Sequence, residues 1–390
     1  MKEDKIWSKG FTILLVSNVF AVLGIQMLAA TIALFFVSLG ATESQVGIVA
    51  TLFFISSIAT RLLINVVLKR AGKKRVLLTG MLLTTIVIVL YGLAESLGVA
   101  AVLRVFQGLG FGVITTVSVT IAVDFLPASR RGQGIGYFSL AHVIAMAFAP
   151  ALALFLRMGY GFPAMFFTAA GFSFIAAVIL FFCKEPPASS ETPVENNEKS
   201  AWWQNLFSRK LIIPAGLLLM FSLSRTADTT FISVFAEASG LLGHLSWYYV
   251  IQTATMFGIR IFVGRFADKK GRNWVLALGG SATLISCMIL SFTNTTALML
   301  IAAFFSGLGY GVVAPSLQVW MFSLVTPEKR SIASATYYNF TDIGIGVGAA
   351  LMGYSAEYFG FPVKFRVGAC AGILYIIGYI VFGWERNKKN

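Results

Sequence analysis

The stretch GLGFGV at residues 108–113 returns as GLGYGV at residues 307–312, 199 positions further along the chain. The same offset joins several other identical residues, namely Arg61 with Arg260, Gly72 with Gly271, Gly80 with Gly279, and Arg131 with Arg330. Identical residues at one fixed offset indicate that a structural unit is repeated. The sequence therefore predicts one unit that is written twice.

The composition is that of a membrane protein. Hydrophobic residues make up 57% of the chain, charged residues make up 12%, and the mean hydropathy is +0.82. The apolar residues fall in runs of roughly 20 to 28, long enough for a helix to cross a hydrocarbon layer about 30 Å thick. Twelve such runs lie near residues 11–38, 44–68, 76–95, 97–126, 134–156, 162–183, 211–237, 243–264, 274–293, 296–325, 332–357 and 361–384.

The apolar runs are expected to be helices, because lipid offers no backbone hydrogen bonds and the runs lack the alternating pattern of barrel strands. The predicted fold is an all-α membrane protein of twelve transmembrane helices in two pseudo-symmetric six-helix bundles, residues 1–183 and 211–390. Between them, residues 184–210 (KEPPASSETPVENNEKSAWWQNLFSRK) are polar and contain prolines, which is typical of a cytoplasmic linker.

The net charge of +14 is distributed as a topology signal. If the N-terminus is cytoplasmic, 23 of the 30 Lys and Arg residues lie on the cytoplasmic side. The opposite side holds Arg157, Lys364 and Arg366, and the spans hold Arg61, Arg104, Arg225 and Arg260. The positive-inside rule then places both termini in the cytoplasm of a multi-pass protein of the cell membrane, with the lipid bilayer as partner and no nucleic acid.

A short polar gap, GRFADKKGRNW at residues 264–274, interrupts the apolar runs. Glycine allows a tight turn, the cations favour the aqueous side next to anionic lipid, and an Asp suits the positive N-terminal end of a neighbouring helix. The gap matches the pattern GxxxDRxGRR of the major facilitator superfamily at Gly264, Asp268, Lys269, Gly271 and Arg272. With its twelve apolar runs, the chain resembles this superfamily over essentially its whole length.

The resemblance implies that this loop latches the two halves when the cytoplasmic side is closed, with Asp268 near the start of the fifth span at residues 129–134. The first-half copy, NVVLKRAGKKR at residues 65–75, departs from the pattern because Lys69 stands where Asp is usual. The predicted latch is therefore asymmetric: the second-half loop has the Asp, and the first-half loop lacks it. The alternative is that the cations only set the topology, which is what we expect of residues 73–75.

Ionised side chains inside a bilayer are costly, so each one is a candidate functional residue. The fourth span carries LRVFQGLGFG, which resembles the family pattern RxxQGxG, at Arg104 and Gln107. Arg104 has no acidic neighbour one helical turn away, so it is expected to reach across a cavity for a partner, a substrate or water. The alternative is that it belongs to a buried structural pair.

The seventh span holds SRTADTTF, in which Arg225 and Asp228 are three residues apart and share one helix face. Burial and the neighbouring Arg act in opposite directions on the proton affinity of the carboxylate, so Asp228 is the first candidate for a proton carrier. The alternative is a permanent salt bridge. The resemblance implies that spans 1, 4, 7 and 10 line a central cavity, whose candidate residues are Gln26, Arg104, Gln107, Arg225, Tyr310 and Trp320.

The family arrangement also implies contacts between spans 2 and 11 and between spans 8 and 5. We therefore predict that Arg61 contacts Asp342, the second candidate for protonation, and that Arg260 contacts His142 or a backbone carbonyl. The fifth span resembles the drug:proton antiporter pattern of spaced glycines ending in Gly-Pro, although Ala replaces two of the glycines. The predicted conformational gate comprises Arg61, Arg260, Gly264, Asp268, Gly271, Arg272, Pro150 and His142.

The residues give little support for an enzyme. The chain has three cysteines and two histidines without metal-ligand spacing, and no segment matches the nucleotide-binding pattern GxxxxGK[ST]. We expect no metal and no cofactor. The sequence favours a monomeric secondary transporter with alternating access, most simply proton-coupled export of a small amphipathic organic compound. Alternatives are a proton-coupled uptake symporter or sugar transporter of the same fold, and a lipid flippase.

Overall fold

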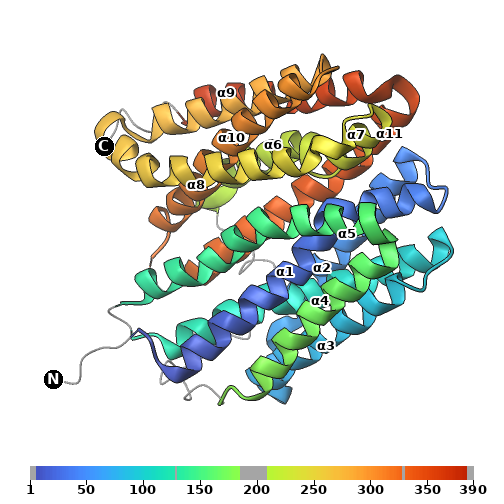
Figure 1. Cartoon of the computed structure of the whole chain (residues 1–390). Coiled ribbons are helices and arrows are strands. Elements are labelled where there is room, and N and C mark those ends of the chain that lie inside the picture. The colour runs from blue at the N-terminus through green and yellow to red at the C-terminus, as the bar shows by residue number, and fades with distance from the viewer. Residues whose placement is uncertain (1–5, 128–129, 185–208, 327–329, 384–390) are drawn as a thin grey trace. The chain divides into compact units, whose positions relative to one another are not determined.

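A computed structural model describes residues 6–127, 130–184, 209–326 and 330–383, which are almost entirely helical (Figure 1). By contact, the chain divides into two units, Met1–Gly40 with Leu52–Thr192 and Ala41–Thr51 with Pro193–Asn390. Each unit is described by itself below.

The first unit is built from five long helices: α1 Lys9–Ser38, α2 Glu43–Ala71 (whose first residues, up to Thr51, fall in the second unit), α3 Lys73–Tyr91, α4 Leu97–Phe125 and α5 Arg131–Phe181. Helix α5 is interrupted at Gly161, where φ is +84°, and Pro163 follows two residues later. This break lies between the apolar runs 134–156 and 162–183. Within the unit, α1 packs along α5 and α3 packs against α4.

The second unit has the helices α6 Ile212–Thr229, α7 Ile232–Ala238, α8 Leu245–Lys270, α9 Arg272–Ser291, α10 Thr296–Ser323 and α11 Arg330–Gly378. Short turns at Arg209–Leu211, Leu242–His244 and Tyr379–Gly383 complete it. Helix α11 is interrupted at Gly360, where φ is +81°, with Pro362 following. Here α6 packs along α11 and α9 packs against α10, the same pairing of elements as in the first unit.

The backbone repeats at the offset seen in the sequence. Gly161 and Gly360 break equivalent helices, and Gly72 and Gly271, with φ of +80° and +79°, precede α3 and α9. Ser96 and Thr295 are equivalent N-caps, since each side-chain oxygen accepts the amide three residues on at 3.4 Å. Positive φ is open to Gly without steric strain, so these glycines place the turns of both halves at matching points.

Eight described helical segments are long and apolar enough to cross a membrane. They are Lys9–Ser38, Glu43–Ile64, Lys73–Tyr91, Leu97–Phe125, Gln133–Phe181, Arg272–Ser291, Thr296–Ser323 and Ile332–Gly383. Two of these contain the glycine breaks at 161 and 360. The chain is therefore an all-helical, multi-pass membrane protein.

The seventh apolar run differs from the continuous helix that the sequence predicted. Helix α6 ends at Thr229 and α7 begins only at Ile232. The Thr229 hydroxyl donates to the Arg225 carbonyl at 3.1 Å, and β-branched side chains with competing hydroxyls weaken a helix. The interruption covers Thr230 and Phe231, and it begins two residues after Asp228.

Candidate functional site

Asp228, at the end of α6, is buried at the junction of three helices. Its side chain is 3% exposed, and its Oδ2 accepts the hydroxyl of Tyr248 from α8 at 3.2 Å and the hydroxyl of Ser306 from α10. The amide of Gln252, also on α8, donates to the Ser306 oxygen at 2.7 Å and orients it. The other carboxylate oxygen, Oδ1, has no hydrogen-bond partner among the described residues. The site therefore holds a carboxyl group in which one oxygen is hydrogen-bonded and the other is not.

Arg225 lies one turn before Asp228 but contacts a different partner. Its guanidinium carbon is 3.6 Å from the centre of the Tyr310 ring, a close cation–π contact, and no ion pair joins it to Asp228 in the described structure. The permanent salt bridge weighed as an alternative is absent from this arrangement. Two residues of the predicted cavity, Arg225 and Tyr310, are thus in direct contact.

Lys364 corrects the charge count made from the sequence, which placed it on the aqueous side opposite the cytoplasm. The structure buries its side chain completely, at 0% exposure, in the second part of α11. The break at Gly360 and Pro362 starts a new helix, and the packing of α11 on α6 turns the fourth residue of that helix inward. The Nζ atom lies 3.7 to 5.9 Å from the ring centres of Phe365, Phe361, Phe231 and Phe235.

In the first unit, Arg104 has a partner on its own helix. Its Nη1 donates to Gln107 Oε1 at 2.7 Å, the Tyr91 hydroxyl donates to the same oxygen at 3.2 Å, and the guanidinium lies 4.3 Å from the Phe53 ring centre. Arg104 is 8% exposed. The predicted residues Arg104 and Gln107 are therefore brought together as a buried cluster.

The buried polar groups of the two units occupy related positions. Gln107 in α4 and Ser306 in α10 are 199 residues apart, so they are equivalent in the repeat. Gln107 accepts from a buried cation, whereas Ser306 donates to a buried anion. Sequence analysis singled out Gln107 and missed Ser306, although the offset that revealed the repeat also connects them.

Trp320, another predicted cavity residue, is 2% exposed in the core of the second unit. The guanidinium of Arg272, from the loop motif, lies 4.0 Å from its ring centre. This contact joins the motif directly to α10. Gln26 is partly buried in α1, and Pro150 is buried inside α5.

The structure describes only some of the predicted gate residues. Gly271 precedes α9 with φ of +79°, whereas the surroundings of Gly264 and Asp268 lie outside what the structure describes. Arg61 donates to the Thr115 hydroxyl at 3.4 Å, Asp342 is 5% exposed, and His142 is exposed. The proposed pairs of Arg61 with Asp342 and of Arg260 with His142 link different units and stay predictions.

Residues 73–75, expected to act only as topology signals, include two with specific contacts. Lys73 Nζ forms an ion pair with Asp124 Oδ2 at 2.6 Å, which ties the start of α3 to the end of α4. Lys74 Nζ donates to the Phe181 carbonyl at 2.9 Å. These cations therefore also fix the helix ends within the first unit.

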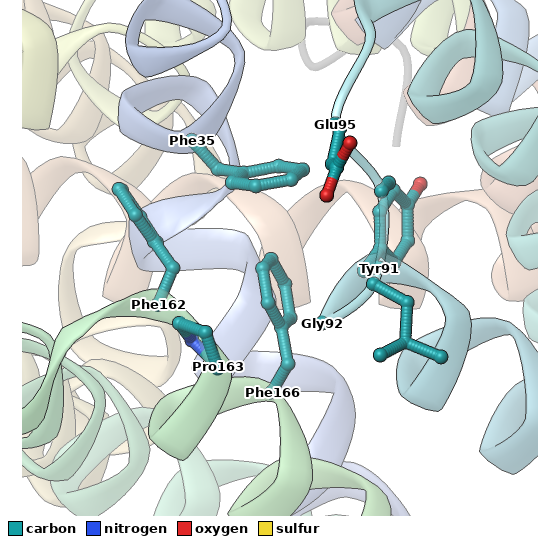
Figure 2. Close-up of a pocket in the computed structure, with 9 residues that line it drawn as sticks. Phe35, Tyr91, Gly92, Glu95, Phe162, Pro163 and Phe166 are labelled. Carbon is teal, nitrogen blue, oxygen red and sulfur yellow. The ribbon is translucent and has the colours of Figure 1, made fainter.

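A separate pocket of about 420 Å³ lies in the first unit where α3 ends and α5 is interrupted (Figure 2). Aromatic rings form its floor, with Phe35 and Phe166 packed edge to face at 4.8 Å between ring centres. Figure 2 shows the carboxylate of Glu95 at the edge of this aromatic cluster. The rings pack mainly on one another.

Comparison with known proteins decides the family. The profile of the Major Facilitator Superfamily matches residues 14–273 and 217–390, which cover nearly all of the sequence. The chain belongs to the Major Facilitator Superfamily. It is a transporter and not an enzyme.

Two curated relatives and one solved structure describe this membership further. The chain is 21% identical to the staphylopine export protein of Staphylococcus aureus strain Mu50, over 87% of this chain and 86% of that protein. It is 22% identical to multidrug resistance protein 2 of Bacillus subtilis strain 168, over 100% of this chain and 99% of that protein. These names confirm the resemblance to the drug-efflux branch. A mutant of the nucleoside transporter NupG has the same fold, with a TM-score of 0.81 and 13% sequence identity. The match covers 95% of this chain and 99% of that one.

Proposed function

We propose that this protein is a proton-coupled exporter of small amphipathic organic compounds, working by alternating access. The observation that carries the proposal is Asp228, a buried carboxylate with one unpartnered oxygen, next to the break between α6 and α7. Discontinuous helices near the membrane midplane are common at coupling sites in secondary transporters. Asp342, which is also buried, is the second candidate for the coupled proton.

The physical basis of coupling is the cost of a buried charge. An ionised carboxylate away from water costs several kcal/mol unless its oxygens are fully hydrogen-bonded. Asp228 Oδ2 has two hydroxyl donors but Oδ1 has none, so a bound proton would remove the charge without breaking either bond. A conformational change that alters the surroundings of Asp228 would alter its affinity for that proton. Proton binding is thereby linked to the conformation of the helices around Asp228.

Export of amphipathic compounds is supported by the relatives and by composition. Two relatives are named as an export protein and as a multidrug resistance protein. Phe, Trp and Tyr make up 14% of the chain, and the Arg225 and Tyr310 pair offers both a charge and an aromatic face. Such groups suit ligands that combine an apolar body with a polar group.

The proposed architecture places two six-helix halves, residues 1–183 and 211–390, around a central substrate site. Paired glycine breaks at equivalent positions support the duplication. The cations concentrated on one side support cytoplasmic termini in the cell membrane. We propose that one chain is the functional unit.

The test uses purified protein in liposomes. Compounds that raise the thermal stability of the protein are selected first, and their transport is then followed with and without an imposed pH gradient. Asp228→Asn should abolish gradient-driven transport while exchange of labelled for unlabelled compound continues. Glu237→Gln, which changes an exposed carboxylate on α7, is the matched control and should transport normally. Uphill transport by Asp228→Asn, or transport driven only by sodium, would refute the proposal.

A further inference from the structure

Lys364 is a buried ammonium without a hydrogen-bond partner in the described structure. Its surroundings are aromatic, with four phenylalanine ring centres between 3.7 and 5.9 Å from Nζ. A cation–π contact contributes about 0.5 to 2 kcal/mol, whereas removing an ammonium from water costs several kcal/mol. The rings therefore offset only part of the cost, and a nearby negative charge is needed to hold the cation there.

Asp228 is the acidic side chain available to supply that negative charge. Phe231, whose ring centre lies 5.5 Å from the Lys364 Nζ atom, follows Asp228 by three residues, and Asp228 Oδ1 is the carboxylate oxygen that no described donor occupies. The other titratable or charged groups around Asp228 are Arg225 on α6, Tyr248 and Tyr249 on α8, and Cys287 on α9. Arg225 is engaged with the Tyr310 ring. Lys364 is thus the counter-charge that comes from a different helix.

The two residues lie on elements that pack closely, and each lies beside a break in its helix. Lys364 lies just after the break at Gly360, and Asp228 lies just before the break between α6 and α7. Gly368, one turn beyond Lys364, allows close approach of α11 to α6, because a Cβ there would meet the Ala227 side chain at 2.6 Å. A tilt of the second part of α11 at Gly360 would move the ammonium away from the carboxylate.

We propose that Lys364 is a positioning residue for proton coupling: it holds Asp228 ionised while the two are close, and its withdrawal allows Asp228 to take up a proton from water. This inference rests on the proposed role of Asp228. The step is a simple protonation, in which a carboxylate oxygen gains a proton and Lys364 keeps its own. An opposite charge nearby favours the ionised form of an acid, and loss of that charge favours the neutral form.

The decisive experiment measures the protonation of Asp228 directly. The infrared carboxyl band of protonated Asp228, identified by its loss in Asp228→Asn, is titrated against pH in purified protein in liposomes without substrate. Lys364→Met should raise the midpoint of this titration by about one pH unit, the size of effect expected from one close charge. Lys364→Arg, which keeps the charge, should restore the wild-type midpoint.

Two controls separate this role from a structural one. Arg366→Met removes an exposed cation from the same part of α11, and it should leave the midpoint unchanged. If Lys364→Met does not fold, the double variant Asp228→Asn with Lys364→Met removes both charges and should restore folding, because neither charge is left uncompensated. Failure of the double variant to restore folding would overturn the proposal.

The outcomes also separate this proposal from the proposed function. An unchanged midpoint in Lys364→Met, or the absence of any Asp228-dependent band, would overturn the role of Lys364. A shifted midpoint in a protein that shows no gradient-driven transport would support the pair and refute proton-coupled export. The infrared titration uses no substrate, so it stands whether or not a transported compound has been found.

Discussion

The cluster of Arg104, Gln107 and Tyr91 allows a quantitative test of whether a charge inside the fourth span is structural. Gln107→Leu keeps the approximate size of the side chain but removes the oxygen that accepts from Arg104 at 2.7 Å and from Tyr91 at 3.2 Å. Arg104 is only 8% exposed and its Nε already lacks a partner, so the substitution leaves a buried cation poorly satisfied. Loss of the hydrogen-bond acceptor of a buried charged group costs about 1.5 to 3 kcal/mol.

The Phe53 ring, 4.3 Å from the guanidinium, is in contact with Arg104 before and after the substitution, so it does not change this cost. The expected destabilisation is therefore about 1.5 to 3 kcal/mol. At about 2 to 4 °C per kcal/mol for a unit of this size, the Tm of the purified protein should fall by about 3 to 12 °C. The assay is thermal unfolding in detergent, followed by tryptophan fluorescence.

The double variant Arg104→Leu with Gln107→Leu should recover most of the lost stability, because it leaves no unpaired charge. Gln318→Leu, at a partly buried glutamine of α10, is the matched control and should change the Tm by no more than about 2 °C. A Gln107→Leu variant with the wild-type Tm but impaired transport would show that water or substrate solvates Arg104. That result would refute the structural interpretation and favour the cavity role considered from the sequence.

Two further predictions concern the glycine breaks and the cytoplasmic loops. Gly161→Ala and Gly360→Ala should each destabilise the protein by about 1 to 2 kcal/mol in thermal unfolding, because Ala is strained at positive φ. Gly171→Ala, in open space within α5, should be neutral or stabilising, and equal effects at all three positions would contradict the argument. Charge reversal by Asp268→Lys should slow gradient-driven transport in liposomes more than Lys69→Asp does, whereas equal rates would argue against an asymmetric latch.

Much of the fold was predictable because the bilayer acts on each segment separately. The apolar runs near 134–156 and 162–183 could be recognised by length, and the break between them falls at Gly161. The repeat offset predicted equivalence between the halves, and Gly161 and Gly360 show it in the backbone. Positive φ at a turn is a local requirement, so the amino acid itself reports it.

The candidate site was predictable only in its rare charges. Arg104, Arg225 and Asp228 stood out because ionised groups within apolar runs are few, but spacing along one helix could not identify the hydrogen-bond donors of Asp228. The donors Tyr248 and Ser306 come from α8 and α10, and hydroxyls in apolar runs carry no signal of what they bond.

Lys364 shows most clearly what the tertiary structure alone decided. In the sequence it comes shortly after a Gly-Phe-Pro stretch, near the start of the apolar run 361–384, where a lysine is expected to reach water. In the structure, the direction set at Gly360 and the packing of α11 on α6 turn it into a cage of aromatic rings. Hydropathy depends on which residues a segment contains, whereas burial of one side chain depends on how the helix is rotated against its neighbours, and packing alone determines that rotation.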